Sequence, residues 1–259
     1  MAADPNDSAL WIRRFHPAPD SAIRLVCLPH AGGSAAVYFP MSRALKDDAD
    51  VLSVQYPGRQ DRRAEPGVRD MAEYADRVYD ALLPWNDRPL ALFGHSMGAV
   101  IAFEVARRLE ERAGTVPARL FVSGRRAPSR TREGEDLHRR DDAGLIDEMR
   151  RLNGTDSTLL DDPELLPLIL PALRSDYTAI ETYVHRPGPP LAAPVTALVG
   201  DADPRATLEE VRAWRDHTSG AFDMEVFPGG HFYLTDHQDR VAGLVAGHLR
   251  ALRTAGPRN

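Results

Sequence analysis

The chain has 259 residues, of which 43% are hydrophobic and 27% charged, and its formal net charge is -6. This balance is typical of a single globular α/β domain over 1–259 that carries an insertion, and the negative charge gives no support for nucleic-acid binding. The single cysteine, Cys27, excludes an internal disulfide framework and favours a reducing, cytoplasmic environment. The N-terminal residues lack a signal-peptide pattern and no apolar run reaches membrane-spanning length, so we expect no membrane association.

Short β-type runs alternate with helical patterns along most of the chain. Residues 1–10 are expected to form a frayed or partly ordered start, and 11–15 an edge strand. Further strands are expected at 22–28, 51–55, 90–93, 119–123, 194–199 and 222–227. Apolar residues with helical spacing mark 35–45, 71–82, 100–111 and 241–252. This alternation predicts a mainly parallel central sheet with helices on both faces.

One region, 125–190, breaks the alternation because no β-type run appears in it. A charged segment is followed by a helical face of Leu145, Met149 and Leu152, and then by a long apolar run over 165–183 that Pro167 and Pro171 interrupt. We interpret the region as an α-helical insertion at the edge of the sheet where ligands bind in open α/β folds. A lid over an active site is the functional interpretation, and an additional packing layer is the alternative.

The strongest motif is Gly94-His95-Ser96-Met97-Gly98, which lies between a β-type run and a helical run. Its two glycines flank the serine at the spacing of a nucleophile elbow, a strained turn between a strand and a helix. Glycine at both positions lets the strand and the helix cross closely. The sequence therefore predicts Ser96 as a nucleophile that points out of the sheet, at the positive end of a helix.

A serine nucleophile needs a base, and the base needs an acid that orients it. In this arrangement the acid ends a late strand, where Asp201 and Asp203 both follow the run 194–199. We favour Asp203, because it lies further beyond the strand, and keep Asp201 as the alternative that caps the turn. His231 follows the last strand in a glycine-rich loop and is the expected base.

The expected roles follow from this set of residues. Ser96 attacks an acyl carbonyl, His231 accepts and returns the proton, and Asp203 holds the imidazole tautomer. The oxyanion needs two amide donors, which we expect from Met97 and from the loop near Ala31. His30 is expected to shape that loop and His95 to pack beside the elbow, whereas the other late histidines are expected at the surface or at helix caps. These are His217, His237 and His248.

No cofactor or metal is expected. The histidines are scattered, there is no pair of cysteines and no H-E-x-x-H motif, so the sequence offers no metal-ligand set. The glycine-rich loop Ala31-Gly32-Gly33-Ser34 lacks the spacing of a dinucleotide-binding fingerprint.

Five segments together carry a family resemblance that spans residues 10 to 250. They are Leu28-Pro-His-Ala-Gly-Gly-Ser34, Gln55-Tyr-Pro-Gly-Arg-Gln-Asp-Arg62 with Glu65-Pro66, Gly94-His-Ser-Met-Gly98, Gly200-Asp-Ala-Asp-Pro204 and Pro228-Gly-Gly-His-Phe232. The chain resembles the type II thioesterases, the editing thioesterases of polyketide and nonribosomal peptide synthesis. The first two segments are the more specific signal, because many hydrolases share the elbow.

The resemblance implies an α/β-hydrolase fold with Ser96, Asp203 and His231 as the triad, and with Met97 and Ala31 as oxyanion donors. It also implies a substrate, an acyl group on the phosphopantetheine arm of an acyl or peptidyl carrier protein, and an activity that frees stalled or wrongly loaded carriers. We expect a monomer. An acidic carrier would need a local basic patch on this acidic chain. The candidates are Arg59, Arg62, Arg63, Arg125, Arg126, Arg130, Arg132, Arg139 and Arg140.

Other activities fit the same triad. A carboxylesterase or lipase would use it on oxygen esters, and an acyltransferase would replace water with an alcohol or amine. The arginines could equally form a solvated, salt-bridged surface. A binding protein of this fold without activity would be expected to lack triad residues, and none is missing here.

Overall fold

The computed structural model describes residues 5–132, 134, 136–152, 162 and 164–254. These residues form one seven-stranded sheet in the order β1-β3-β2-β4-β5-β6-β7. The strand at the edge, β1, pairs antiparallel with β3, and all other neighbours are parallel. The strands are β1 (Ile12–Arg13), β2 (Arg24–Leu28), β3 (Asp50–Val54), β4 (Leu90–His95), β5 (Arg119–Ser123), β6 (Val195–Gly200) and β7 (Phe222–Phe227).

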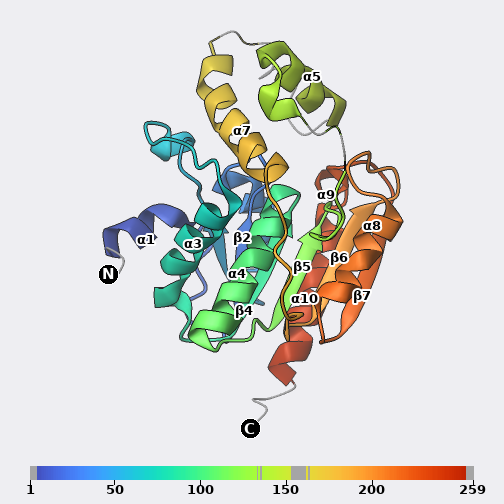
Figure 1. Cartoon of the computed structure of the whole chain (residues 1–259). Coiled ribbons are helices and arrows are strands. Elements are labelled where there is room, and N and C mark those ends of the chain that lie inside the picture. The colour runs from blue at the N-terminus through green and yellow to red at the C-terminus, as the bar shows by residue number, and fades with distance from the viewer. Residues whose placement is uncertain (1–4, 133, 135, 153–161, 163, 255–259) are drawn as a thin grey trace.

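Helices cover both faces of this sheet, as Figure 1 shows. The α-helices are α1 (Pro5–Trp11), α2 (Phe39–Ala44), α3 (Met71–Leu82), α4 (Met97–Ala113), α5 (Asp142–Leu152), α7 (Leu166–Glu181), α8 (Leu208–Arg212), α9 (Tyr233–Asp236) and α10 (Gln238–Thr254). Short 3₁₀ helices are η1 (Ala35–Tyr38), η2 (Gln60–Arg62), η3 (Leu83–Trp85), η4 (Leu137–Arg139) and η5 (Ala213–His217). The predicted architecture, a mainly parallel sheet between helical layers, is confirmed.

The alternation of side chains along each strand divides the core into two layers. In β2, Val26 and Leu28 pack in the cluster that includes α3, α4 and α8, whereas Leu25 and Cys27 pack in the cluster that includes α2 and α10. Cys27 is fully buried, and burial raises the pKa of its thiol, which fits the predicted role as a small core residue. No described helix is both long and apolar enough to cross a membrane.

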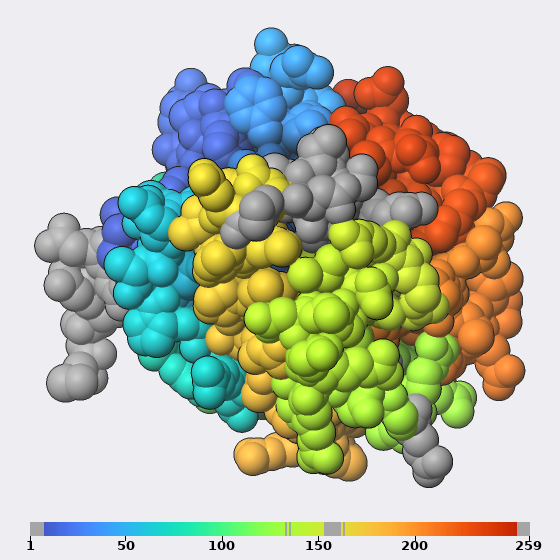
Figure 2. Space-filling view, turned by 90° about the horizontal axis from the view of Figure 1, so that it is seen from above, coloured from blue at the N-terminus to red at the C-terminus, as the bar shows by residue number. Residues whose placement is uncertain are grey.

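The segment between β5 and β6 contains η4, α5 and α7, which form a separate layer at the end of the sheet that carries Ser96. A third apolar cluster of Leu137, Leu145, Leu170 and Leu173 holds these helices together. Figure 2, which looks down on this end, shows α5 in yellow-green beside α7 in yellow across the face. Pro167 lies in the first turn of α7, where no intrahelical amide bond is lost, and the helix continues through Pro171. The prolines therefore interrupt the apolar run of the sequence but not the helix, and the predicted helical character of this region is confirmed.

The structure refines one expectation at the start of the chain and overturns one about His217. The N-terminal residues begin with α1, which packs on α3 through a hydrogen bond from Ser8 Oγ to the Ala81 carbonyl, 3.0 Å long. Tertiary packing, rather than helix propensity, accounts for a helix this short. His217 is buried in contact with the rings of Phe103 and Trp214, so its predicted surface position is wrong.

Candidate active site

Ser96 lies in the turn between β4 and α4 with a backbone φ of 55°, a left-handed conformation that is strained for a serine. A Cβ on Gly94 would lie 2.1 Å from the Gly98 carbonyl oxygen, and one on Gly98 would lie 2.0 Å from the Leu28 carbonyl oxygen. Only glycine fits at either position, because backbone would have to move to admit a side chain. The predicted elbow is present, and the helix that follows directs its N-terminus toward Ser96.

The other two predicted residues converge on this serine. His231 Nε2 lies 3.0 Å from Ser96 Oγ, and His231 Nδ1 lies 3.0 Å from both carboxylate oxygens of Asp203. The side chain of Asp203 is fully buried, and that of His231 is 3% exposed. These distances allow a proton to pass from the hydroxyl to an imidazole whose tautomer the buried carboxylate fixes.

The choice between the two aspartates after β6 follows from their partners. Asp203 Oδ1 accepts hydrogen bonds from His231 and from the amide of Arg205. Asp201 is exposed, and its carboxylate accepts a hydrogen bond from the Gly229 amide, 2.9 Å away. Asp201 therefore holds the loop that carries His231, whereas Asp203 contacts the histidine itself.

Two backbone amides near Ser96 are available to a ligand. Met97 begins α4, so its amide precedes the hydrogen-bonded ladder of the helix. Within the described part of the chain, no acceptor is within hydrogen-bond distance of the Ala31 amide. Both residues line the same small cavity as Ser96 and His231. The two amides that the sequence predicts as oxyanion donors are thus brought to one place.

The His95 ring packs on the His231 ring, and the His30 ring packs in turn on His95. The centroid of the His95 ring lies 5.1 Å from that of His231 and 5.9 Å from that of His30. Burial and the charge of His231 lower the pKa of His30 to about 3 and the pKa of His95 well below its usual range. Both rings are therefore neutral at pH 7, which avoids repulsion of a protonated His231. The expected positions of His95 beside the elbow and His30 in the loop are confirmed.

The cavity beside Ser96 is small and covered. Its volume is about 30 Å³, and Leu152 of α5 together with Tyr177, Ile180 and Glu181 of α7 forms its cover. A single ordered water needs about 10–15 Å³ measured in this way. The described residues therefore leave room for roughly two waters beside Ser96, which is less than an acyl chain needs.

Several arginines that the sequence offered for docking belong to the fold instead. Arg59 and Arg62 are 6% and 3% exposed. Arg59 pairs with Asp176 of α7, and Arg62 pairs with Glu65. Arg126 is 5% exposed, so it offers little surface to a partner. These three candidates are therefore poorly placed to contact a carrier, because acids and carbonyls of the fold take up their side chains.

Sequence patterns point to neither Asp176 nor Arg205. Asp176 shares the largely apolar helix α7 with one other acid, Glu181, and an acid among apolar residues is the one available signal. Arg205 follows the aspartate pair and forms an ion pair with Glu148 of α5. Both residues connect loops of the site to the helices that cover it.

A parallel sheet of this order, with a serine in a strained turn between β4 and α4 and a histidine after the last strand, defines an α/β-hydrolase fold. The family description "Thioesterase domain" matches residues 23–249. The chain therefore belongs to the thioesterase family, and it is a thioester hydrolase.

Three similar proteins place the chain within this family. It is 56% identical to thioesterase PikA5 of Streptomyces venezuelae over 96% of this chain and 89% of the relative. It is 53% identical to the probable cadicidin biosynthesis thioesterase of Streptomyces griseus over 96% of this chain and 68% of the relative. Among solved structures, the type II thioesterase BorB from the borrelidin biosynthetic cluster superposes with a TM-score of 0.88 at 51% identity, over 93% of this chain and 98% of BorB. The predicted membership of the type II thioesterases, and with it the editing function, is confirmed.

Proposed function

We propose that this enzyme hydrolyses acyl thioesters on the phosphopantetheine arm of acyl or peptidyl carrier proteins, with Ser96, His231 and Asp203 as its catalytic triad. The observation that carries the assignment of residues is the 3.0 Å contact between His231 Nε2 and Ser96 Oγ beside two available amides. The names of the related proteins support a carrier-bound substrate, because all three are thioesterases and two of them are named for a biosynthetic pathway or cluster.

The reaction proceeds in two stages. Ser96 Oγ attacks the thioester carbonyl while His231 Nε2 accepts its proton, and the tetrahedral intermediate collapses to an acyl-enzyme as His231 returns the proton to the leaving thiol. Water, deprotonated by His231, then attacks the acyl-enzyme, and Ser96 leaves with the proton. Asp203 stabilises the imidazolium in both stages.

The negative oxygen of each intermediate lies against the amides of Met97 and Ala31. The N-terminus of α4 adds its partial positive charge at this point. Loss of one donor of this kind costs about 3–4 kcal/mol of transition-state stabilisation.

The helices of 125–190 act as a lid in this proposal. A chamber of about 30 Å³ cannot admit a thioester and its arm, so turnover requires part of the cover to move. The small volume beside Ser96 supports a lid over an additional packing layer.

A basic groove next to the chamber is the proposed docking surface. It has a volume of about 400 Å³ and runs along the 125–132 loop, and it shares Arg125, Ile180 and Glu181 with the chamber. Arg130 is exposed at its rim. An acidic carrier would be attracted there.

Arg130→Glu should raise KM for a carrier-bound substrate and leave turnover of a short free thioester unchanged. Arg77→Glu on α3, outside the groove, provides the same charge change as a control.

The test of the function is a panel of acyl chains on carriers, with nitrophenyl esters and with alcohol or amine acceptors added. The proposal expects carrier thioesters to be hydrolysed to free acids by the wild type and not by Ser96→Ala. Preference for simple oxygen esters would indicate a carboxylesterase or lipase, and transfer products would indicate an acyltransferase. Residual hydrolysis by Ser96→Ala would refute the mechanism. A monomeric state and a cytoplasmic site of action stay predictions.

A further inference from the structure

The loop that carries the Ala31 amide is attached to α7 of the lid. The amide of Gly32 donates a hydrogen bond to Asp176 Oδ2, 2.7 Å away. Arg59 donates to the Gly33 carbonyl at 3.0 Å and, through its other terminal nitrogen, to both oxygens of Asp176 at 2.8 and 2.9 Å. Two consecutive residues beyond Ala31 are thus held by one buried ion pair.

Asp176 has no contact with solvent, and donors surround its carboxylate. The Tyr74 hydroxyl donates to Oδ1 at 2.5 Å, in addition to the bonds from Gly32 and Arg59. Burial by itself would lower the pKa of Arg59, but the adjacent Asp176 carboxylate raises it, so the guanidinium stays charged. A buried carboxylate with this many donors is strongly confined in position.

The backbone of the loop depends on this contact. Gly32 has a φ of +76°, and a Cβ there would lie 2.8 Å from Leu173 Cδ1, so the loop is pressed against α7. The Gly33 amide also donates a hydrogen bond to the His30 carbonyl, 2.9 Å away, and closes a tight turn around Ala31. The direction of the Ala31 amide is therefore fixed between a turn and the Asp176 contact.

We propose that Asp176 is a positioning residue that aligns the Ala31 amide with the oxyanion, through Gly32 and Arg59. The inference rests on the proposed function, in which that amide is an oxyanion donor. Asp176 touches no reacting atom. It acts by keeping the donor where charge develops, and displacement of such a donor by about 1 Å can cost on the order of 10²-fold in rate.

The primary test is Asp176→Asn, which retains the size of the side chain and removes the charge that holds Arg59. We expect kcat to fall about 10²-fold with KM within threefold of the wild type. Binding of an alkylboronic acid, whose adduct with Ser96 places an oxygen in the oxyanion site, should weaken by a similar factor. A purely structural role would lower stability without moving inhibitor affinity and kcat together.

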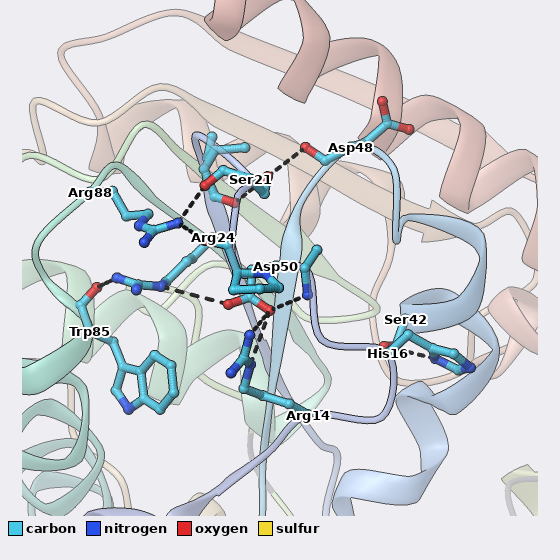
Figure 3. Close-up of polar contacts among 12 residues, drawn as sticks. Arg14, His16, Ser21, Arg24, Ser42, Asp48, Asp50, Trp85 and Arg88 are labelled. Carbon is cyan, nitrogen blue, oxygen red and sulfur yellow. Dashed lines mark hydrogen bonds and ion pairs between the residues drawn. The ribbon is translucent and has the colours of Figure 1, made fainter.

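Asp50 provides a matched control at the opposite end of the sheet. It is the first residue of β3, is 1% exposed, and contacts Arg14 at 2.9 Å and Arg24 at 3.9 Å (Figure 3). It also accepts a hydrogen bond from the Ala18 amide. Asp50→Asn therefore removes a buried charge from a similar arginine network that is remote from Ser96. We expect a loss of stability and an unchanged kcat.

A second variant covers the case in which Asp176→Asn does not fold. Arg59→Lys keeps the positive charge but cannot bridge the Gly33 carbonyl and Asp176 together. It should lower kcat about tenfold at constant KM. The inference is overturned if the soluble variants lower kcat no more than Asp50→Asn, or leave boronic acid affinity unchanged. Failure of the proposed function has a different signature, hydrolysis that persists in Ser96→Ala.

Discussion

Glu148 in α5 forms an ion pair with Arg205, two residues beyond Asp203 in the chain. Glu148 is 7% exposed and also pairs with Arg151 within its own helix. Burial opposes the charge, but Arg151 and Arg205 together hold the pKa of the Glu148 carboxyl below its usual range. The ion pair therefore ties one helix of the proposed lid to the loop that carries the proposed catalytic acid.

Arg205→Gln should loosen α5 and favour larger substrates. Loss of the ionic partner destabilises the closed arrangement by about 1 kcal/mol, which is roughly fivefold in the ratio of open to closed lid. Because the volume beside Ser96 is too small for an acyl chain, kcat/KM for medium-length chains relative to acetyl should rise several-fold. Steady-state kinetics on a series of acyl thioesters measures that ratio.

Arg151→Gln is the matched control for this prediction. Arg151 contacts the same carboxylate at 2.8 Å but lies in α5 itself, so its removal leaves the helix attached to Arg205. The chain-length preference should match that of the wild type. If both variants changed the preference equally, the connection between α5 and the loop would not control access.

Substitutions of the two aspartates after β6 should have very different effects on kcat. Asp203→Asn retains the side-chain size but removes the charge that stabilises protonated His231, so kcat should fall by about 10⁴-fold. Asp201→Asn can still accept the hydrogen bond from Gly229 and should cost less than tenfold. Comparison of kcat for the two variants at pH 7 separates the roles. A larger loss in Asp201→Asn would reverse the assignment.

The parts of the site that the sequence predicts are those with local signals. The elbow can be predicted because a strand and a helix cross closely on either side of Ser96, and only glycine fits at the two crossing positions. His231 is readable because a glycine-rich loop follows a strand. The distance from the strand end and the family resemblance favour Asp203 over Asp201, but the decisive contacts to Gly229 and His231 come from the neighbouring loop.

The remaining features depend on contacts between distant parts of the chain. The sequence alone does not distinguish Arg59 from surface arginines, because its partner Asp176 is 117 residues away. No local pattern predicts that pairing. The same holds for His217, which Phe103 and Trp214 bury, and for α1, which is stabilised by its packing on α3. Periodicity predicts the strands and long helices, but it does not predict which charged side chains the fold encloses.

Two glycine substitutions, one at the crossing of β4 and α4 and one in α10, should have opposite effects on stability. A Cβ on Gly94 would lie 2.1 Å from backbone oxygen, so Gly94→Ala should destabilise the protein by several kcal/mol or prevent folding. Gly243 lies in α10 with open space around it, and Gly243→Ala should stabilise by about 0.5–1 kcal/mol through helix propensity. Chemical denaturation measures both, and a tolerated Gly94→Ala would contradict the packing of β4 against α4.

The buried histidines predict that stability falls as the solution becomes acidic. The pKa of His30 is about 3 in the folded protein, lowered mainly by burial, and about 6.5 in an unfolded chain. Below pH 6.5 the unfolded state binds a proton that the folded state does not, so the stability present above that pH is lost as pH falls toward 3. Each such residue contributes about 1 kcal/mol per pH unit between pH 6 and 5.

His30→Gln should therefore reduce the slope of unfolding free energy against pH in this interval by about 1 kcal/mol per pH unit. His217, whose pKa burial lowers to about 4, provides an independent test at a second site. The His217 ring forms a hydrogen bond with Ser129 Oγ, 2.9 Å long, at a site away from His30. His217→Gln should therefore also reduce the pH slope of the unfolding free energy. In the double variant the two reductions should add. Urea denaturation at pH 5, 5.5 and 6 gives the slopes. Slopes equal to that of the wild type would mean that these rings accept protons in the folded state, in conflict with their burial.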